Sequence, residues 1–163
     1  MTNIMKIFLS LLLLLAVPAS LIGRFMEAAS YEEMFKKANL VVIARPLSTK
    51  ETKERTTLDK LTLHGLRSLD GPAIPVIGLH TEFETHLVLK GDKNVKKFIV
   101  HHYRLESNLP PLVNGPTLAA FDFKEPKMFL LFLVMEPDGR YAPASGQVDP
   151  AAFSVIQLQS IAE

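Results

Sequence analysis

The sequence contains no cysteine and no tryptophan among its 163 residues. Without thiols the chain cannot form disulfides, hold an iron–sulfur cluster, build a cysteine zinc site or use a cysteine nucleophile. An excess of charge is also missing, because 18 Lys and Arg face 17 Asp and Glu, a formal net charge of +1. Such a balance does not favour nucleic acid as a partner. Apolar residues make up 48% of the chain, which is too many for a disordered protein.

The N-terminus has the layout of a secretory signal peptide. One basic residue, Lys6, precedes an apolar run over residues 7–17, and a proline and small residues follow. We expect cleavage after Ala19, which would give a secreted or periplasmic protein with no membrane segment. The alternative is an uncleaved N-terminal anchor. The uncharged run 7–23 reaches only the lower limit of length for spanning a bilayer, so cleavage is favoured.

The expected mature chain, residues 20–163, is long enough for one domain with its own core. Removal of residues 1–19 takes away Lys6 and no acid, which leaves equal numbers of basic and acidic residues. Since no disulfide is available, the exported domain would depend on its hydrophobic core alone.

The first part of this domain predicts a helix followed by a strand. Apolar residues at helical spacing form one stripe, and Ser30 is a plausible N-cap. The β-branched run 40–44 predicts a buried strand, and Pro46 confines its continuation to a sheet edge. Residues 47–57 are polar without an apolar period, which predicts a solvated loop or hairpin arm. The helical stripe consists of Tyr31, Met34, Phe35 and Ala38.

A β-hairpin is predicted next, from alternation over residues 79–90, a turn at 91–94 and a return strand over 95–103. One register pairs Leu87 with Phe98 and keeps a single face apolar. A slip of one residue would instead turn Ile99 and Tyr103 to the core.

The eight apolar residues 128–135 predict a strand buried on both faces, with a turn at 137–139 and a short return strand at 140–142. A short strand at 117–123 and a last helix opened by Asp149 and Pro150 complete the chain. Strands and helices do not alternate, so we predict a mainly β fold: a small antiparallel barrel or curled sheet with N- and C-terminal helices. The inner stripe of the last helix would hold Ala152, Phe153 and Ile156.

Three stretches occur in a familiar order: ANLVVIAR at 38–45, FETHLVLKG at 83–91, and MFLLFL at 128–133 followed by DGRY at 138–141. In this order they resemble the netrin/metalloproteinase-inhibitor (TIMP-like) module and its bacterial secreted relatives, over roughly residues 30–145. The resemblance implies a five-stranded OB-type barrel and an extracytoplasmic binding role. The animal inhibitors act through an N-terminal cysteine, which this chain lacks, so no inhibitory residue can be transferred.

Alternating His and Glu residues on the predicted strand 79–90 raise the question of a metal site. Glu84 and His86 could meet His101 of the partner strand in one register, with His101 opposite Glu84. His80 and His86 would lie about 20 Å apart, too far for one ion. The ordinary interpretation is a solvated sheet face with cross-strand His–Glu pairs. We therefore expect no metal site, with Glu84, His86 and His101 as the candidates.

The sequence predicts no catalytic residue and no cofactor. Ser145 lacks the surroundings of a nucleophile elbow, and the glycines form no phosphate loop. We expect a non-enzymatic exported domain that binds a protein or envelope component through segments 46–58 and 104–127. Phe121 and Phe123 would be a contact patch there, or would cap the barrel. The alternatives are an exported metal-binding protein and a hydrolase with an unrecognised site.

Overall fold

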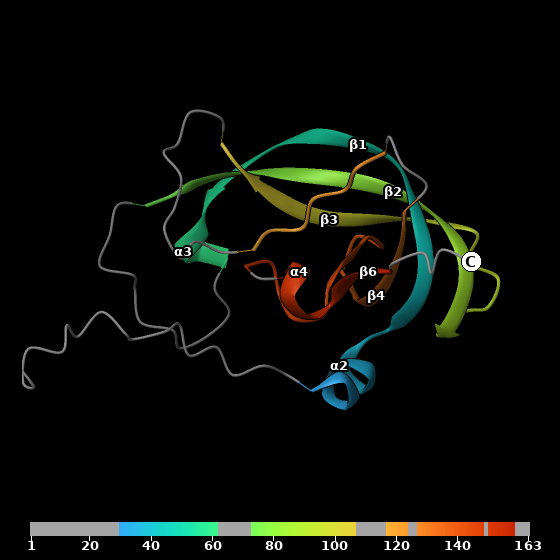
Figure 1. Ribbon diagram of the computed structural model, residues 1–163. Coiled ribbons are helices and arrows are strands. Elements are labelled where there is room, and N and C mark those ends of the chain that lie inside the picture. The colour runs from blue at the N-terminus through green and yellow to red at the C-terminus, as the bar shows by residue number, and fades with distance from the viewer. Residues whose placement is uncertain (1–29, 62–72, 107–116, 124–126, 149, 159–163) are drawn as a thin grey trace, which may run out of the picture.

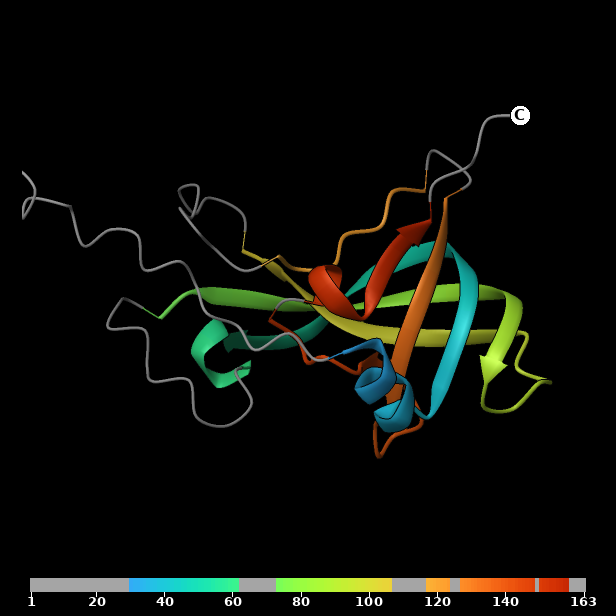
Figure 2. The same ribbon diagram turned by 60° about the horizontal axis from the view of Figure 1, so that its bottom comes forward.

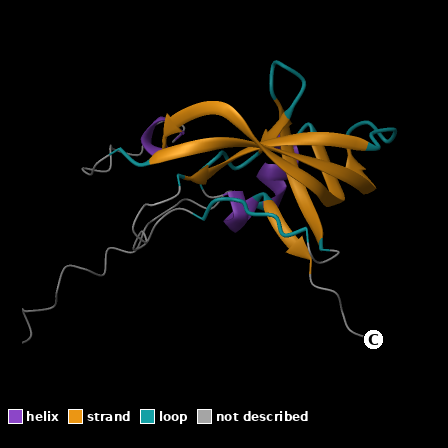
Figure 3. Ribbon diagram, turned by 90° about the horizontal axis from the view of Figure 1, so that it is seen from above, coloured by secondary structure: helices purple, strands orange, loops and turns teal. Residues whose placement is uncertain are grey.

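The computed structural model describes residues 30–61, 73–106, 117–123, 127–148 and 150–158, and Figures 1 and 3 show their arrangement. The expected signal peptide lies outside this part of the chain, as does Asp149. Among the described helices, none combines the length and the apolar character needed to cross a membrane. The strands are β1 (Leu40–Thr57), β2 (Pro75–Lys90), β3 (Lys97–Leu105), β4 (Met128–Met135), β5 (Tyr141–Pro143) and β6 (Val155–Leu158), and the short helices are α2 (Tyr31–Lys37), α3 (Leu58–Leu61) and α4 (Pro150–Phe153).

The six strands form one sheet in the order β1-β2-β3-β5-β4-β6, and an additional β1–β4 pairing closes five of them into a ring. Pairing is antiparallel except between β3 and β5, which share one parallel pair, Val100 with Tyr141. β6 lies beside residues 128–131 of β4, beyond the short β5. The prediction of a mainly β chain is therefore confirmed.

β1 is much longer than the predicted strand. It bends from α2 around one side of the ring and runs out to α3 (Figure 1). Its pairing with β4 ends at Ala44, so from Pro46 onward β2 is the one described strand that pairs with it. Of the two predictions for residues 47–57, the loop is wrong and the hairpin arm is present, because backbone pairing with Pro75–Glu82 holds these polar residues in a strand. With β2 and β3 they form an arm that projects from the ring (Figure 2).

The β2–β3 hairpin is present, but its register differs from the predicted one. Phe98 pairs with Phe83 rather than with Leu87, a shift of four residues that keeps both aromatic rings inside. β1 steps from Ile43 to Ala44 while its partner on β2 steps from Leu87 to Thr85, which makes His86 an extra, bulged residue. The bulge reverses the faces, so Leu87 is 49% exposed and Val88 is buried.

Helix α2 begins as predicted. Ser30 forms a capping box with Glu33, and Met34 packs on the outer side of β4. The predicted stripe is narrower than expected, since Tyr31 and Phe35 are exposed.

The prediction of a C-terminal helix through Ile156 is wrong, because only the four-residue turn α4 is helical. The chain then continues as β6, whose backbone pairs with the edge of β4 that β5 leaves open.

The core lies inside the ring, and a loop completes it. β4 is buried on both faces as predicted: Phe129, Leu131 and Leu133 face inward, and Phe132 packs outward against α2. The expected strand over 117–123 is absent, because this segment crosses the ring as a loop. Its Phe121 packs against the rings of Phe83, His102 and Phe129, with centroid distances of 4.9, 5.0 and 5.1 Å.

Candidate functional site

The structure separates the three metal candidates of the sequence. Glu84 pairs with Lys97 across the hairpin and bonds Arg45 at 2.5 Å. His101 lies four residues further along β3, about 13 Å away at strand spacing. His86 is exposed on the bulge of β2. In the described residues, no three His, Asp or Glu side chains are arranged to hold a metal ion.

His101 instead belongs to a polar cluster on the outer face of the arm, and a glycine makes room for it. Gly78 of β2 lies opposite Tyr103 of β3. A Cβ at Gly78 would lie 2.7 Å from Thr52 Oγ1 and 3.1 Å from Glu54 Cβ. The register of β1 shifts between Glu51 and Arg55, and Thr52 Oγ1 donates to Gly78 O at 3.1 Å. This bulge places Glu54 over Gly78, from where it accepts a hydrogen bond from the Tyr103 hydroxyl.

Two carboxylates flank the His101 ring, whose side chain is only 6% exposed. Nδ1 lies 3.0 and 3.1 Å from the two oxygens of Glu136, just after β4. Nε2 lies 3.1 Å from Glu54 Oε2, a close contact that lies outside hydrogen-bond geometry. Burial, and to a smaller extent the hydrogen bond to Glu54, raises the pKa of Tyr103, so its hydroxyl remains a donor. His101 therefore joins β1, β3 and the β4–β5 turn.

Arg140 of the same turn completes the cluster. Its guanidinium bonds Asp138 Oδ2 through Nη2 at 2.6 Å and lies 3.4 Å from Glu136. It also donates to Nε2 of His80, whose ring meets that of His101 edge-on at 5.6 Å. Burial, and to a smaller extent the charge of Arg140, lowers the pKa of His80, so the ring stays neutral and Nε2 can accept. The hydrogen bond from Arg140 holds the pKa of Asp138 below its usual range.

A second histidine, His102, is buried on the inner side of the sheet. Its Nδ1 donates to Ala119 O at 3.2 Å, so in the neutral ring Nε2 accepts from Thr81 Oγ1 at 2.7 Å. Thr81 in turn lies 2.5 Å from Thr49 Oγ1. Burial lowers the pKa of His102 to about 4. This chain of hydrogen bonds fastens the loop 117–123 inside the ring.

The outer cluster links β1, β3 and the β4–β5 turn through its charged side chains. The two nitrogens of one imidazole point in opposite directions, so Glu54 and Glu136 cannot share a metal ion with His101. The charged groups pair with one another, and the Ser145 hydroxyl lies 2.6 Å from the Ser154 hydroxyl. The partners of His101 come from separate elements, which is why strand alternation did not find them. The lone glycine at position 78 was the available signal, since glycine within a strand marks a close approach.

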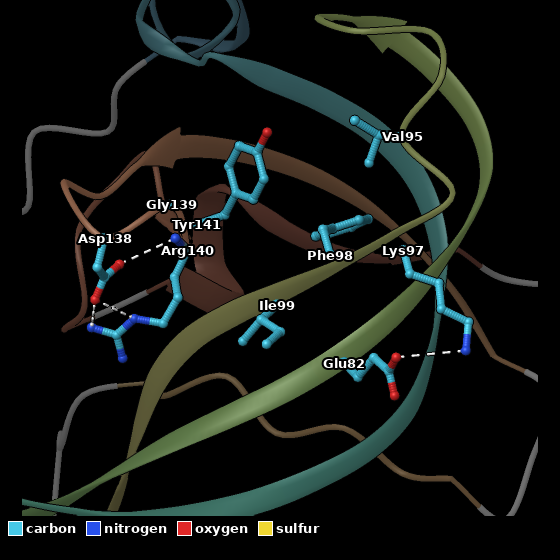
Figure 4. A pocket seen from close by; sticks show the side chains of 9 residues that line it. All are labelled: Glu82, Val95, Lys97, Phe98, Ile99, Asp138, Gly139, Arg140 and Tyr141. Atoms are coloured by element: carbon cyan, nitrogen blue, oxygen red, sulfur yellow. Dashed lines mark hydrogen bonds and ion pairs between the residues drawn. The ribbon is translucent and has the colours of Figure 1, made fainter.

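A groove opens beside the cluster, between the start of β3 and the turn that leads into β5 (Figure 4). Its volume is about 520 Å³. Phe98 and Tyr141 meet edge-on in its apolar floor, with centroids 5.8 Å apart. The full lining is Glu82, Val95, Lys97, Phe98, Ile99, Asp138, Gly139, Arg140 and Tyr141.

Comparisons with protein-family models, with curated proteins and with solved structures found no match for this chain.

Proposed function

We propose that this chain is an exported, non-enzymatic binding domain with an OB-like, TIMP-like barrel, which acts by contacting another protein in the cell envelope or outside the cell. The ring of five strands supports the architecture, since OB folds are five-stranded, partly open barrels. The single pair between β3 and β5 is consistent with the open side of such a barrel. The three stretches that resemble the TIMP-like module fall on the start of β1, the end of β2 and the β4–β5 hairpin.

The observation that carries the binding role is the groove beside β3. It combines a strand edge with an apolar floor at the surface, and Ile99 at its rim is 41% exposed. An exposed apolar surface framed by charged residues is typical of an interaction site. Segment 46–58, which the sequence suggested as a binding loop, is largely paired strand and offers less open backbone.

Export is tested first. The full chain would be produced with a C-terminal tag in its native organism, and the tagged protein recovered from cell fractions and medium. We expect it outside the cytoplasm with Ser20 as its first residue. A tagged chain that stays in the cytoplasm, or in the membrane with Met1 intact, would contradict export with cleavage.

Binding is tested in the same cells by chemical cross-linking and mass spectrometry of the recovered chain. We expect one saturable partner, displaced when untagged chain is produced in excess. A tagged chain with the far-ultraviolet circular dichroism of a folded β protein and no displaceable partner would contradict the binding role.

A further inference from the structure

The groove beside β3 arises because two strands of the ring diverge. β3 and β5 share only the pair Val100 with Tyr141. Before that pair, residues Lys97–Ile99 have β2 on one side, and no described strand lies along their other edge. The chain entering β5 turns away through Asp138–Arg140, which leaves a wedge between this edge and the turn (Figure 4).

The sides of the wedge have different chemistries. Its floor is apolar, with Phe98 and Tyr141 in contact, and Ile99 stands on its outer rim. Charged side chains occupy the two ends in opposite pairs: Glu82 with Lys97 at 3.5 Å, and Asp138 with Arg140. Because one positive and one negative side chain pair at each end, the wedge has no excess of positive charge to attract phosphate groups or an anionic lipid surface.

These features favour an extended polypeptide as the occupant. A strand edge presents backbone donors and acceptors at the spacing of another strand, which a small ligand or a folded apolar surface does not match. Three residues of β3 offer about 10 Å of edge, enough for a segment of three or four residues. Alternate side chains would then point to the floor and to the rim. A Cβ at Gly139 would meet no atom within 4 Å, so the turn leaves that side open.

The other exposed edge of the hairpin is a weaker candidate. Beyond Glu84, no strand in the described part of the chain pairs with the β3 side of β2, and Leu87 and Leu89 are exposed there. However, the hairpin's own turn returns over this edge, where Lys93 Nζ donates to Val88 O at 2.6 Å. A lysine placed on a strand edge is a common means of blocking further pairing.

We propose that the wedge between β3 and β5 binds an extended segment of a partner protein, which adds a short strand to the Lys97–Ile99 edge and places one apolar side chain against Phe98 and Tyr141. This inference rests on the proposed binding function and names the kind of segment that the domain takes. Ile99 would pack against the outward side chains of that segment, and the ion pairs at the two ends would limit its length.

The test uses a linear heptapeptide library displayed on phage and selected on the immobilised protein recovered from its native organism. The selected peptide is resynthesised in versions that carry one backbone N-methyl group each. Strand addition predicts that N-methylation of every second residue weakens binding roughly tenfold, since each such group removes one hydrogen bond, and that the intervening positions tolerate it. Uniform tolerance, or losses without alternation, would overturn strand addition.

Ile99→Asp locates the site, and Leu89→Asp is the matched control, since Leu89 is exposed to a similar extent (45%) away from the wedge. We expect Ile99→Asp to weaken peptide binding at least tenfold and Leu89→Asp to leave it unchanged. Equal binding by both variants would place the site elsewhere and overturn this inference, while the proposed binding function would stand. The peptide scan on the unaltered chain decides the case if Ile99→Asp fails to fold.

A photoreactive phenylalanine analogue at position 99 of the full chain, in the native organism, identifies the occupant. A cross-link to a peptide of another protein, absent with the analogue at position 89, is the expected result. A cross-link between two copies of this chain would overturn the choice of partner. No selected peptide and no cross-link at any exposed position would count against the proposed function itself.

Discussion

Glu54 of β1 reaches Tyr103 of β3 across an intervening strand, because Gly78 of β2 has no side chain between them. The contact joins the first and third strands of the arm and brings a carboxylate to the His101 ring. The contact forms because Gly78 lacks a Cβ, which lets the bulge at Thr52 of β1 approach the backbone of β2 closely.

The variant Gly78→Ala is expected to displace this bulge. A Cβ 2.7 Å from Thr52 Oγ1 is closer than packed atoms tolerate, so we expect unfolding to become easier by about 1–3 kcal/mol. Urea denaturation followed by tyrosine fluorescence measures the change. Thr52→Ala removes the nearest obstructing atom, so Gly78→Ala should cost less in that background than in the original chain. Equal costs in both would show that Thr52 is not what the added methyl group meets.

The sequence predicted the ring strands better than it predicted their contacts. Eight consecutive apolar residues can only be a doubly buried strand or helix segment in a domain of this size, and β4 is such a strand. The length of β1 was missed because its polar half is held by backbone pairing, which leaves no hydrophobic period. The face reversal in β2 was missed because the bulge at His86 depends on β1, which alternation within one strand cannot reveal.

The outer cluster was beyond the reach of sequence patterns for a related reason. His101 was a candidate, but the carboxylates that flank it come from Glu54, in a segment predicted as a loop or hairpin arm, and from Glu136, just before a predicted turn. Only the ring closure brings these segments together. The helix start signal at Pro150 is obeyed, but α4 ends after four residues because the chain that follows pairs with the free edge of β4 as a strand.

Glu136→Gln tests the contact with His101. The substitution keeps the shape of the side chain and removes the charge that faces a buried imidazole at 3.0 Å. We expect a loss of about 1–3 kcal/mol in the free energy of unfolding. Glu82→Gln is the control, because Glu82 pairs with Lys97 at the surface, where such pairs contribute about 0–1 kcal/mol. Equal small losses in both variants would show that the cluster does not fasten the turn to β3.

His102 makes the stability of the domain depend on pH. Its pKa is lowered from 6.5 to about 4 by burial, so between these values the unfolded chain binds a proton that the folded chain does not. Stability is therefore full above pH 6.5 and falls as the pH approaches 4, by about 3 kcal/mol from this group. His80, whose pKa burial also lowers, adds a change of the same sign.

The measurement is the urea midpoint of unfolding at intervals between pH 7 and pH 4. His102→Gln should flatten this dependence, since an amide can bond both Ala119 O and Thr81 Oγ1 without titrating. His86→Gln, at an exposed position, should leave the profile of the original chain. A His102→Gln profile as steep as the original would assign the acid sensitivity to other groups.

Phe121 and Phe123 provide a matched test of how the loop 117–123 contributes to the core. Phe121 packs against three aromatic side chains enclosed by the strands. Phe123, two residues further along the chain, is 44% exposed. Phe121→Ala should therefore cost about 2 kcal/mol or more in the free energy of unfolding, because it removes a half-buried ring that packs against Phe83, His102 and Phe129. Phe123→Ala should cost less than about 1 kcal/mol. Similar costs for the two would contradict the packing of Phe121 within the core.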